Sequence, residues 1–586
     1  MKIFRSLGWF FKEQKIYYLF GVSILFLIAL LQLIPPLYIG KVVDAISSDT
    51  LTKTKLIEWM LLLVGVAIVT YLGRYVWRMM IFGSDNKLQR KLRLRLFEHF
   101  TKMSPFFFQR YRTGDLMAHA TNDITAIQQV AGIGILTLAD SFLTGGTVIA
   151  MMAISIDWRL TLIALLPMPL MVIGSSVLGK MLHDRFHEAQ AAFSRLNDKV
   201  QESIAGIKVT RTFGQEKEDI ADFSDQTVDV VDRNMKVAKI DALYDPMISI
   251  VVGMSFVITL GVGAKFMVDG SLSIGQLVSF VNYLFLLIWP MLAFGFLYNI
   301  LQRGSASYDR VDRLLQEKED IVDQPDAKTV ISSSDLQFDL KSFTYPDETE
   351  PVLQNIAFSI RAGETLGIVG RTGSGKTTLL KLLLREYDSY QGDIYLGEEP
   401  LTAYQTKVLR RAIGYVPQDQ FLFSTTVADN IRFGYPDASN QQVEEVAKLV
   451  SVHDDIVEFK DGYRTIVGER GVSLSGGQKQ RLAIARALIL DPELLILDDA
   501  LSAVDAKTEE KILANLRQER TAKTTIISAH RLSSVEHADL IIVVEDGQIK
   551  ERGTHAELLE KDGWYAEIYR EQQLEEALEK GGGANE

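Results

Sequence analysis

Long stretches of apolar residues with few charges dominate the first half of the chain. Each can form a helix long enough to cross, or nearly cross, about 30 Å of hydrocarbon at about 1.5 Å per residue. The pattern therefore predicts an all-α transmembrane domain of six spanning helices. The predicted spans are residues 16–40, 59–82, 130–156, 160–179, 246–263 and 277–301.

The first two spans need a further argument. Met1–Lys15 is basic, but the apolar run that follows is too long for the core of a signal peptide, so we expect a retained membrane helix. Arg74 and Arg78 interrupt the second span. We expect this span to leave the hydrocarbon there and to continue as a helix in water.

Lys and Arg concentrate in the long second and fourth connections between the spans. Because cytoplasmic connections retain positive charge, both are expected in the cytoplasm, while the short connections Asp157–Arg159 and Asp269–Ser271 face outside. Helical spacing in the long connections predicts pairs of helices that extend from the membrane. Their tips, near Arg112–Leu116 and Phe213–Glu216, are expected to transmit force to a soluble domain.

The pattern changes beyond about residue 302, where short apolar runs alternate with amphipathic helices. This alternation is typical of an α/β domain with a parallel sheet and crossover helices. The predicted fold class is a multi-domain membrane protein, with an all-α six-helix domain followed by an α/β nucleotide-binding domain. The expected parts are a transmembrane domain (1–311), a linker (312–330), a nucleotide-binding domain (331–572) and a C-terminal tail (573–586).

Charge and cysteine content exclude several classes of function. The formal net charge of −12 argues against a nucleic-acid surface, which needs clustered Lys and Arg to neutralise phosphates. The chain contains no cysteine, which excludes disulfides, thiolate metal sites and cysteine catalysis. Both observations fit soluble parts that remain in the cytoplasm.

A glycine-rich segment follows the apolar strand Thr365–Val369 and opens a helix expected to run through Leu384. Its glycines allow backbone amides to approach phosphate oxygens, and a helix N-terminus favours negative charge. Lys376 would neutralise the β- and γ-phosphates of ATP, and the Thr377 hydroxyl would hold Mg²⁺. The predicted ATP-binding residues are Gly370, Arg371, Thr372, Gly373, Ser374, Gly375, Lys376, Thr377 and Thr378.

Two further segments carry phosphate chemistry. The apolar run Leu494–Asp498 ends in a carboxylate that would hold the other side of Mg²⁺. A second glycine-containing segment precedes a helix expected from Lys479 to about Leu488, and it offers another set of N-terminal amides to an anion. This segment consists of Leu474, Ser475, Gly476, Gly477 and Gln478. Two such helix starts in one chain indicate either two nucleotides or one nucleotide shared between subunits.

In this order and spacing, the motifs resemble those of the ATP-binding-cassette (ABC) family, in its exporter branch with the membrane domain first, over essentially the whole chain. The resemblance implies that Leu474–Gln478 is the signature that reaches the γ-phosphate of ATP held by the opposite subunit. It therefore favours the interpretation in which a nucleotide is shared between subunits. It further implies that Tyr345 stacks on adenine, Gln418 senses Mg²⁺ and the membrane domain, Ser502 and Asp505 run across the dimer, His530 contacts the γ-phosphate, and Gly468–Gly471 touches the cytoplasmic helix tips.

The chain departs from the family pattern at Asp499, where the family normally has a glutamate that orients and deprotonates the attacking water. Shortening the side chain withdraws the carboxylate by about 1 Å, and misplacement of that size can cost about 10²-fold in rate. ATP is therefore expected to bind but to hydrolyse slowly at this site, unless a loop shifts to compensate. Beside an intact signature, the change suggests an asymmetric heterodimer.

The membrane spans offer candidate contacts for a substrate. A carboxylate such as Asp140 costs free energy within a span, so it is a candidate contact for a cationic drug. The alternatives are that Asp140 pairs with a neighbouring helix or lies near the outer interface. An aromatic-rich sixth span suits flat, apolar cations through stacking and cation–π contacts. Its candidate residues are Asn282, Tyr283, Trp289, Phe294, Phe296 and Tyr298.

We therefore expect an ATP-driven exporter of hydrophobic or cationic drugs in the bacterial cell membrane, with ATP and Mg²⁺ as cofactors and a second half-transporter as partner. A lipid flippase of the same architecture remains the alternative. The predicted spans exclude a soluble cassette ATPase, and the fusion of the two domains in one chain argues against an importer.

Overall fold

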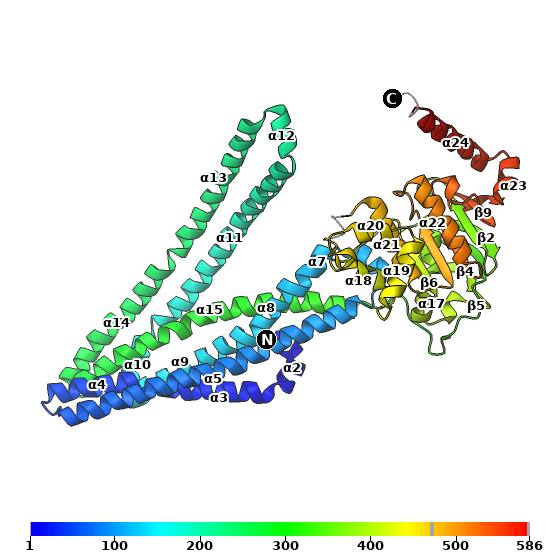
Figure 1. Ribbon diagram of the computed structural model, residues 1–586. Helices are drawn as coiled ribbons and strands as arrows, with labels where there is room; N and C mark the ends of the chain where they lie inside the picture. The colour runs from blue at the N-terminus through cyan, green and yellow to red at the C-terminus, as the bar shows by residue number, and fades with distance from the viewer. Residues whose placement is uncertain (1, 469–473, 583–586) are drawn as a thin grey trace. The chain divides into compact units, whose positions relative to one another are not determined.

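The computed structural model describes residues 2–468 and 474–582 and divides into two compact units. The first comprises Met1–Lys102 and Tyr111–Glu317, and the second comprises Met103–Arg110 and Lys318–Glu586. In Figure 1 the first unit is entirely helical, whereas the second holds the strands. The predicted fold class, a helical membrane domain followed by an α/β domain, is confirmed.

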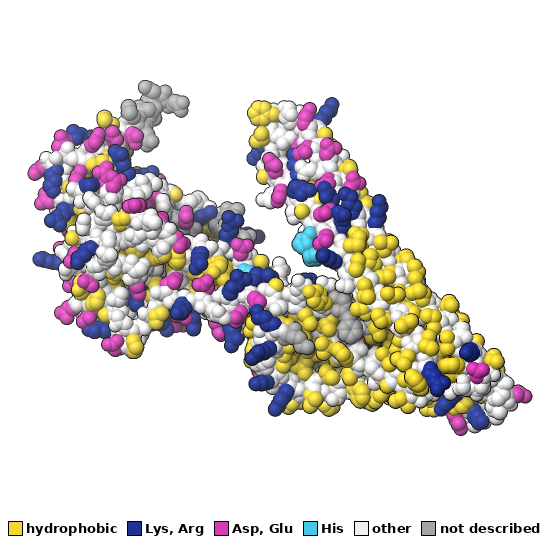
Figure 2. Space-filling view, turned by 180° about the vertical axis from the view of Figure 1, so that it is seen from behind, with side chains coloured by type: hydrophobic (Ala, Val, Ile, Leu, Met, Phe, Trp, Pro, Cys, Tyr) yellow, Lys and Arg dark blue, Asp and Glu magenta, His cyan; other side chains and the backbone are white. Residues whose placement is uncertain are grey.

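The described part of the first unit contains 6 helical segments that are long and apolar enough to cross a membrane. Each overlaps one predicted span, so the prediction of six spans is confirmed. On this unit, Figure 2 shows a broad band of hydrophobic side chains along the helices. The segments are Lys15–Ser47, Lys53–Phe100, Thr113–Ser155, Trp158–Ala205, Glu216–Val268 and Ile274–Gln316.

The individual elements of the first unit subdivide some of these segments. They are α1 (Lys2–Ser6), α2 (Gly8–Glu13), α3 (Lys15–Leu31), α4 (Ile34–Ser47), α5 (Lys53–Phe100), α7 (Thr113–Ala118), a π-helical turn η1 (His119–Asp123), α8 (Ile124–Gln129), a π-helical turn η2 (Val130–Gly134), α9 (Ile135–Ser155), α10 (Trp158–Leu165), α11 (Met168–Ala205), α12 (Ile207–Phe213), α13 (Glu216–Asp241), α14 (Tyr244–Val268) and α15 (Ile274–Gln316).

The first span is interrupted between α3 and α4, where Pro35 and Pro36 open the second helix. Proline has no backbone N–H, so it is tolerated in the first turn of a helix and breaks one further along. The buried Tyr283 hydroxyl donates to the Leu33 carbonyl oxygen at 2.6 Å and satisfies a carbonyl at this break. Tyr283 is thus committed to helix packing, and its predicted place in a substrate-facing lining is wrong.

The two long connections differ in how well their tips were predicted. Helix α5 continues past Arg74 and Arg78 to Phe100, as predicted. It ends before Ser104-Pro105, a pair that disfavours helix, so the first tip lies earlier than the predicted Arg112–Leu116, which enters α7. The second tip is confirmed, because Gly214 with φ of +64° separates α12 from α13.

Helix α15 extends beyond the predicted end of the membrane domain. A capping box between Ser273 and Gln276 begins it, and it continues to Gln316. Residues 312–316, which were assigned to a linker, are therefore helical. At the other end of the chain, residues 573–582 of the predicted tail continue the last helix.

The described part of the second unit contains two sheets. The smaller is antiparallel with strand order β2-β1-β4-β5, and the larger has the order β10-β9-β3-β8-β7-β6. In the larger sheet all neighbours run parallel except β10, which confirms the predicted parallel sheet. The strands are β1 (Leu336–Phe343), β2 (Leu353–Ile360), β3 (Thr365–Val369), β4 (Tyr390–Leu396), β5 (Glu399–Pro400), β6 (Ile413–Val416), β7 (Leu494–Asp498), β8 (Thr524–Ser528), β9 (Leu540–Glu545) and β10 (Gln548–Gly553).

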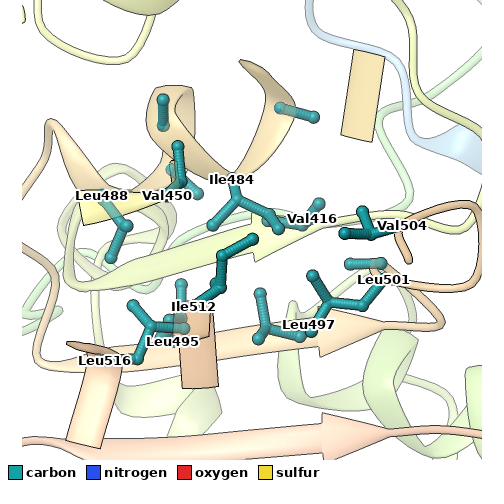
Figure 3. Close-up of a cluster of buried hydrophobic side chains, with 14 of the residues drawn as sticks. Val416, Val450, Ile484, Leu488, Leu495, Leu497, Leu501, Val504, Ile512 and Leu516 are labelled. Atoms are coloured by element: carbon teal, nitrogen blue, oxygen red, sulfur yellow. The ribbon is translucent and has the colours of Figure 1, made fainter. Parts of the chain in front are cut away.

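Helices cover this larger sheet on both faces. Because side chains alternate along a strand, Leu494 and Ile496 of β7 enter one apolar core while Leu495 and Leu497 enter the other. Figure 3 shows part of the second core, in which Ile484 and Ile512 pack near Leu497. The described helical elements of the second unit as a whole are α6 (Pro105–Arg110), α16 (Lys376–Leu383), η3 (Leu401–Ala403), α17 (Thr406–Ala412), α18 (Val427–Arg432), α19 (Asn440–Leu449), α20 (His453–Glu458), η4 (Gly462–Arg464), α21 (Gly476–Leu488), α22 (Ala506–Glu519), η6 (Leu532–Ser534), α23 (His555–Glu560) and α24 (Trp564–Gly582).

Candidate nucleotide-binding site

Three predicted segments meet at the carboxyl ends of adjacent parallel strands. Gly370 follows β3, Asp499 follows β7 and His530 lies just beyond β8. The Asp499 N–H donates to the Ser528 carbonyl at 2.8 Å, and the Ala529 N–H donates to the Ile368 carbonyl at 3.2 Å. Open α/β sheets bind ligands at this edge, so the fold places these segments where a nucleotide can be held.

The phosphate loop requires glycine for two different reasons. At Gly370 an added Cβ would lie 2.1 Å from the Val544 carbonyl oxygen, so only glycine fits. At Gly375, the N-cap of α16, φ is +104°, a conformation that side chains with a Cβ rarely adopt. The glycines thereby let the loop lead directly into a helix N-terminus, a position that suits a phosphate group.

Lys376 is buried at the first position of α16. Its Nζ donates to the carbonyl oxygens of Gly370 at 2.8 Å and Arg371 at 3.0 Å. Burial lowers the pKa of Lys376, while the charges of Asp498 and Asp499 act in the opposite direction. A bound phosphate would add negative charge beside this ammonium group and favour its protonated form.

Asp498 and Thr377 fit a Mg²⁺ ion. Asp498 is 2% exposed, and burial raises the pKa of its carboxyl, which hydrogen bonds involving Thr377 and Ser528 oppose. Among the described residues, the buried Oδ2 of Asp498 has no hydrogen-bond partner. An unpaired buried carboxylate oxygen next to a hydroxyl is the oxygen donor set that Mg²⁺ prefers.

Gln418 and Asp499 also lie together. The Gln418 side chain follows β6, and its Nε2 donates to Asp499 Oδ2 at 3.4 Å. Asp499 has φ of +48°, a left-handed conformation that Asp adopts more readily than most residues. The two predicted residues are thus within reach of each other, although the contact is longer than an ordinary N–H···O bond.

Tyr345 lies beside the phosphate-loop helix. Its hydroxyl and the Thr378 hydroxyl are 2.8 Å apart, and its ring meets those of Phe343 and Tyr387 edge-on at 5.0 and 5.3 Å. The ring is therefore fixed near the nucleotide loop. This position is compatible with the role in adenine stacking implied by the family resemblance.

The signature helix α21 begins earlier than predicted, at Gly476, with Ser475 as its N-cap. Ser475 Oγ accepts from the Gln478 N–H at 3.2 Å, and Gln478 Oε1 accepts from the Ser475 N–H at 3.0 Å. This capping box holds the helix start in place. Positions 469–471 of the predicted segment Gly468–Gly471 lie outside the described residues.

The loop that contains Ser502 and Asp505 packs on this helix start. An added Cβ on Gly477 would lie 2.9 Å from the Ala503 carbonyl oxygen. Asp505 caps α22 by accepting from the Thr508 N–H at 3.0 Å, and this bond lowers the pKa of Asp505. The signature and the loop that contains Ser502 and Asp505 thus form one packed assembly.

Sequence reasoning missed Gln480, which joins these two segments. Its Nε2 donates to Ser502 Oγ at 3.0 Å, and its Oε1 accepts from the Ala503 N–H at 2.8 Å. Gln480 is 3% exposed. The sequence gives no signal for this role, because the burial that obliges Gln480 to find hydrogen-bond partners is visible only in the folded chain.

The sequence also did not reveal how α6 packs within the second unit. Phe106 packs against the core that contains the phosphate-loop helix, and the Tyr387 hydroxyl donates to Gln109 Oε1 at 3.5 Å. Tyr387 is also the ring that Tyr345 contacts. The segment between the second and third spans therefore reaches the aromatic cluster beside the nucleotide loop.

The membrane candidates are only partly brought together. Asp140 Oδ1 accepts from Thr144 Oγ1 at 2.8 Å within α9, and Asn282 Nδ2 donates to the Val278 carbonyl at 2.9 Å within α15. The rings of Trp289 and Phe296 stack at 6.3 Å. Trp289, Phe296 and Tyr298 are exposed, whereas the Phe294 side chain lies outside the described residues.

Comparison with sequence families agrees with this division of the chain. The family described as the ABC transporter transmembrane region matches residues 18–291, and the family described as ABC transporter matches residues 353–502. The first match covers the predicted spans up to part of the sixth, and the second begins at β2 and ends in the loop with Ser502.

Individual proteins match over almost the whole chain. The multidrug resistance-like ATP-binding protein MdlA of Escherichia coli K12 is 47% identical, covering 99% of this chain and 98% of its own. The probable multidrug resistance ABC transporter ATP-binding/permease protein YheI of Bacillus subtilis 168 is 45% identical, covering 99% and 100%. A solved bacterial Atm1-family ABC exporter with ATP bound superposes with a TM-score of 0.77 at 27% identity, covering 97% and 98%.

Proposed function

Because the chain belongs to the ABC transporter family, which couples ATP hydrolysis to transport, we propose that it exports hydrophobic or cationic drugs as one half of a heterodimer. It is a multi-pass cytoplasmic membrane protein with its nucleotide-binding domain in the cytoplasm. The observation that carries the drug proposal is the sequence similarity, 47% and 45% identity over 99% of this chain, to proteins named for multidrug resistance.

In the proposed site, the phosphate-loop amides and Lys376 bind the β- and γ-phosphates of ATP, and Tyr345 holds the adenine. Thr377 and Asp498 would hold Mg²⁺, which when bound neutralises charge on the phosphate oxygens. Gln418 and Asp499 orient the attacking water. His530, just beyond β8, contacts the γ-phosphate.

The signature is proposed to act on the nucleotide of the opposite subunit. Ser475 caps α21 by accepting from the Gln478 N–H, and the Gly476 and Gly477 N–H groups before it have no partner within the helix and can face an anion. Within this chain, Gln478 Nε2 donates to Asp455 Oδ1 at 3.0 Å, and Lys376 Nζ donates to the Gly370 carbonyl oxygen of its own phosphate loop. ATP that binds the closed pair better than the open one would drive closure, as any ligand-driven population shift requires.

The heterodimer proposal rests on Asp499. Its side chain is one methylene shorter than the family's glutamate, so water activation at this site is weakened. The sequence also resembles the BmrC subunit of the two-subunit bacterial multidrug exporter BmrCD. A partner with a full-length glutamate, completed by the intact Ser475 signature, would provide the stronger site.

Exposed aromatic side chains support an apolar substrate. Trp289 and Phe296 stack on each other and are 57% and 58% exposed on α15. Such a pair suits flat, apolar cations. A lipid flippase would use the same architecture, so the substrate class must be tested directly.

The test is ATP turnover by the purified transporter in nanodiscs, with and without a co-purified partner. We expect slow turnover by the chain alone, faster turnover by the pair, and stimulation by cationic drugs. Lys376→Ala in this chain serves as the nucleotide-site control. Rapid turnover by the chain alone would contradict the heterodimer, and stimulation by lipids but not drugs would favour the flippase.

A further inference from the structure

The side-chain amide of Gln572 brackets the loop that carries His530. Its Nε2 donates to the His530 carbonyl oxygen at 2.9 Å, and its Oε1 accepts from the Leu532 N–H at 2.9 Å. His530 lies beyond the end of β8 at Ser528. One side chain therefore fixes the main chain on both sides of Arg531, in a segment that has left the sheet.

A second set of contacts joins the His530 loop to the segment that contains Ser502 and Asp505 and to the helix that follows it. Arg531 Nη1 donates to the Val504 carbonyl at 3.4 Å and to Glu509 Oε2 at 3.4 Å. The Ser534 hydroxyl donates to the other oxygen of Glu509, which is 4% exposed. Both Arg531 bonds are longer than the usual 2.7 to 3.2 Å, whereas both Gln572 bonds lie within it. The Gln572 bonds are therefore the better-formed restraint.

Helix α24 can serve as a fixed support because its first turns are anchored. The buried Tyr565 hydroxyl and His555 Nδ1 are 2.8 Å apart, and the Trp564 N–H donates to Glu551 Oε1 at 2.6 Å. Gln572 lies seven residues after Tyr565, on the same helix face. It is half-buried, whereas its neighbours Glu571 and Gln573 are exposed.

We infer that Gln572 is a positioning residue for ATP hydrolysis: through it, the C-terminal helix α24 holds the main chain of His530 so that the imidazole is aimed at the γ-phosphate. The inference rests on the proposed function, in which His530 makes that contact. A displacement of the loop would misplace the imidazole without touching the phosphate loop, so turnover is affected and ATP binding is not.

The test compares kcat and KM for ATP in the full-length chain, purified in nanodiscs without a partner, so that all turnover comes from this chain's own site. Gln572→Leu keeps the side-chain size and removes both hydrogen bonds. We expect kcat to fall about tenfold with KM unchanged. Gln572→Glu can still accept from Leu532 but cannot donate to His530, and we expect a similar loss. Gln573→Leu, at the exposed neighbouring position, should behave as wild type.

A double mutant separates positioning from a general structural role. If Gln572 acts through His530, adding Gln572→Leu to His530→Ala causes no further loss of kcat. A wild-type rate for Gln572→Leu, or an equal additional loss in the His530→Ala background, would overturn the inference. A wild-type rate for His530→Ala would overturn the role proposed for His530, and with it this inference. Absence of turnover that depends on Lys376 would overturn the proposed function itself.

Discussion

Asp499 stands where the main chain restricts the choice of residue. Its φ of +48° lies in the left-handed region, and its N–H bonds to the Ser528 carbonyl, so the backbone position is fixed by the neighbouring strand. Asp and Asn tolerate this conformation better than longer side chains. The shorter carboxylate therefore suits the backbone, while its reach toward an attacking water is reduced.

Replacing Asp499 with Glu should restore that reach. We expect Asp499→Glu to raise kcat for ATP at this chain's own site by about 10- to 10²-fold, because about 1 Å of displacement is removed, with KM unchanged. The measurement is steady-state ATP hydrolysis by the chain purified without a partner, where turnover comes from its own site. Asp499→Asn, which has the same size and no charge, should instead lower the rate. A turnover at or below the wild-type value in Asp499→Glu would refute the weakened-site account.

Residue type and spacing were enough to propose Lys376 and Asp498 as site residues, because phosphate and Mg²⁺ chemistry uses few side chains in a fixed order. The same information could not reveal Gln480 or Gln572. Both act on main-chain groups of loops distant in sequence. Only the folded chain shows which backbone amide or carbonyl lies opposite a glutamine.

At the scale of elements, α4 and α15 form a closely packed pair. Asp44 accepts from the Gly275 N–H and from the Ser273 hydroxyl, each at 2.7 Å, and the Ser279 hydroxyl donates to the Pro36 carbonyl at 2.9 Å. An added Cβ on Gly275 would lie 2.0 Å from the Gly40 carbonyl oxygen. The first and sixth spans are therefore expected to move together.

Gly275→Ala should separate this pair. Because the new methyl group meets backbone rather than a flexible side chain, we expect a loss of about 1 to 3 kcal/mol and a lower thermal melting point in detergent. Gly146→Ala in α9 is the matched control, since nothing lies within 4 Å of its added Cβ. Equal melting points for the two variants would show that α4 and α15 are not held as described.

Hydropathy predicted which segments form spans, because crossing a bilayer requires length and low charge. It could not locate the break before Ile34 or the turn at Ser104-Pro105, because these depend on local prolines and, at the break, on the tertiary hydrogen bond from Tyr283 to Leu33. Element boundaries were thus the part of the fold that sequence alone left open.

At the scale of the whole molecule, the chain carries one phosphate loop and one signature on separate helix starts, α16 and α21. In the proposed mechanism each ATP lies between the phosphate loop of one subunit and the signature of the other. Pairing is thus a condition for hydrolysis. The sequence predicted this arrangement only through family resemblance, because a single chain does not indicate what lies opposite Ser475.

The most direct test of this claim is a crosslink made from Ser475 in the presence of ATP. The chain contains no cysteine, so Ser475→Cys introduces a single thiol that can carry a maleimide–diazirine photo-crosslinker. The account predicts an ATP-dependent product of two polypeptides, in which position 475 is joined to the phosphate loop of the second subunit. A product within one polypeptide, joining position 475 to its own residues 370–377, would contradict it.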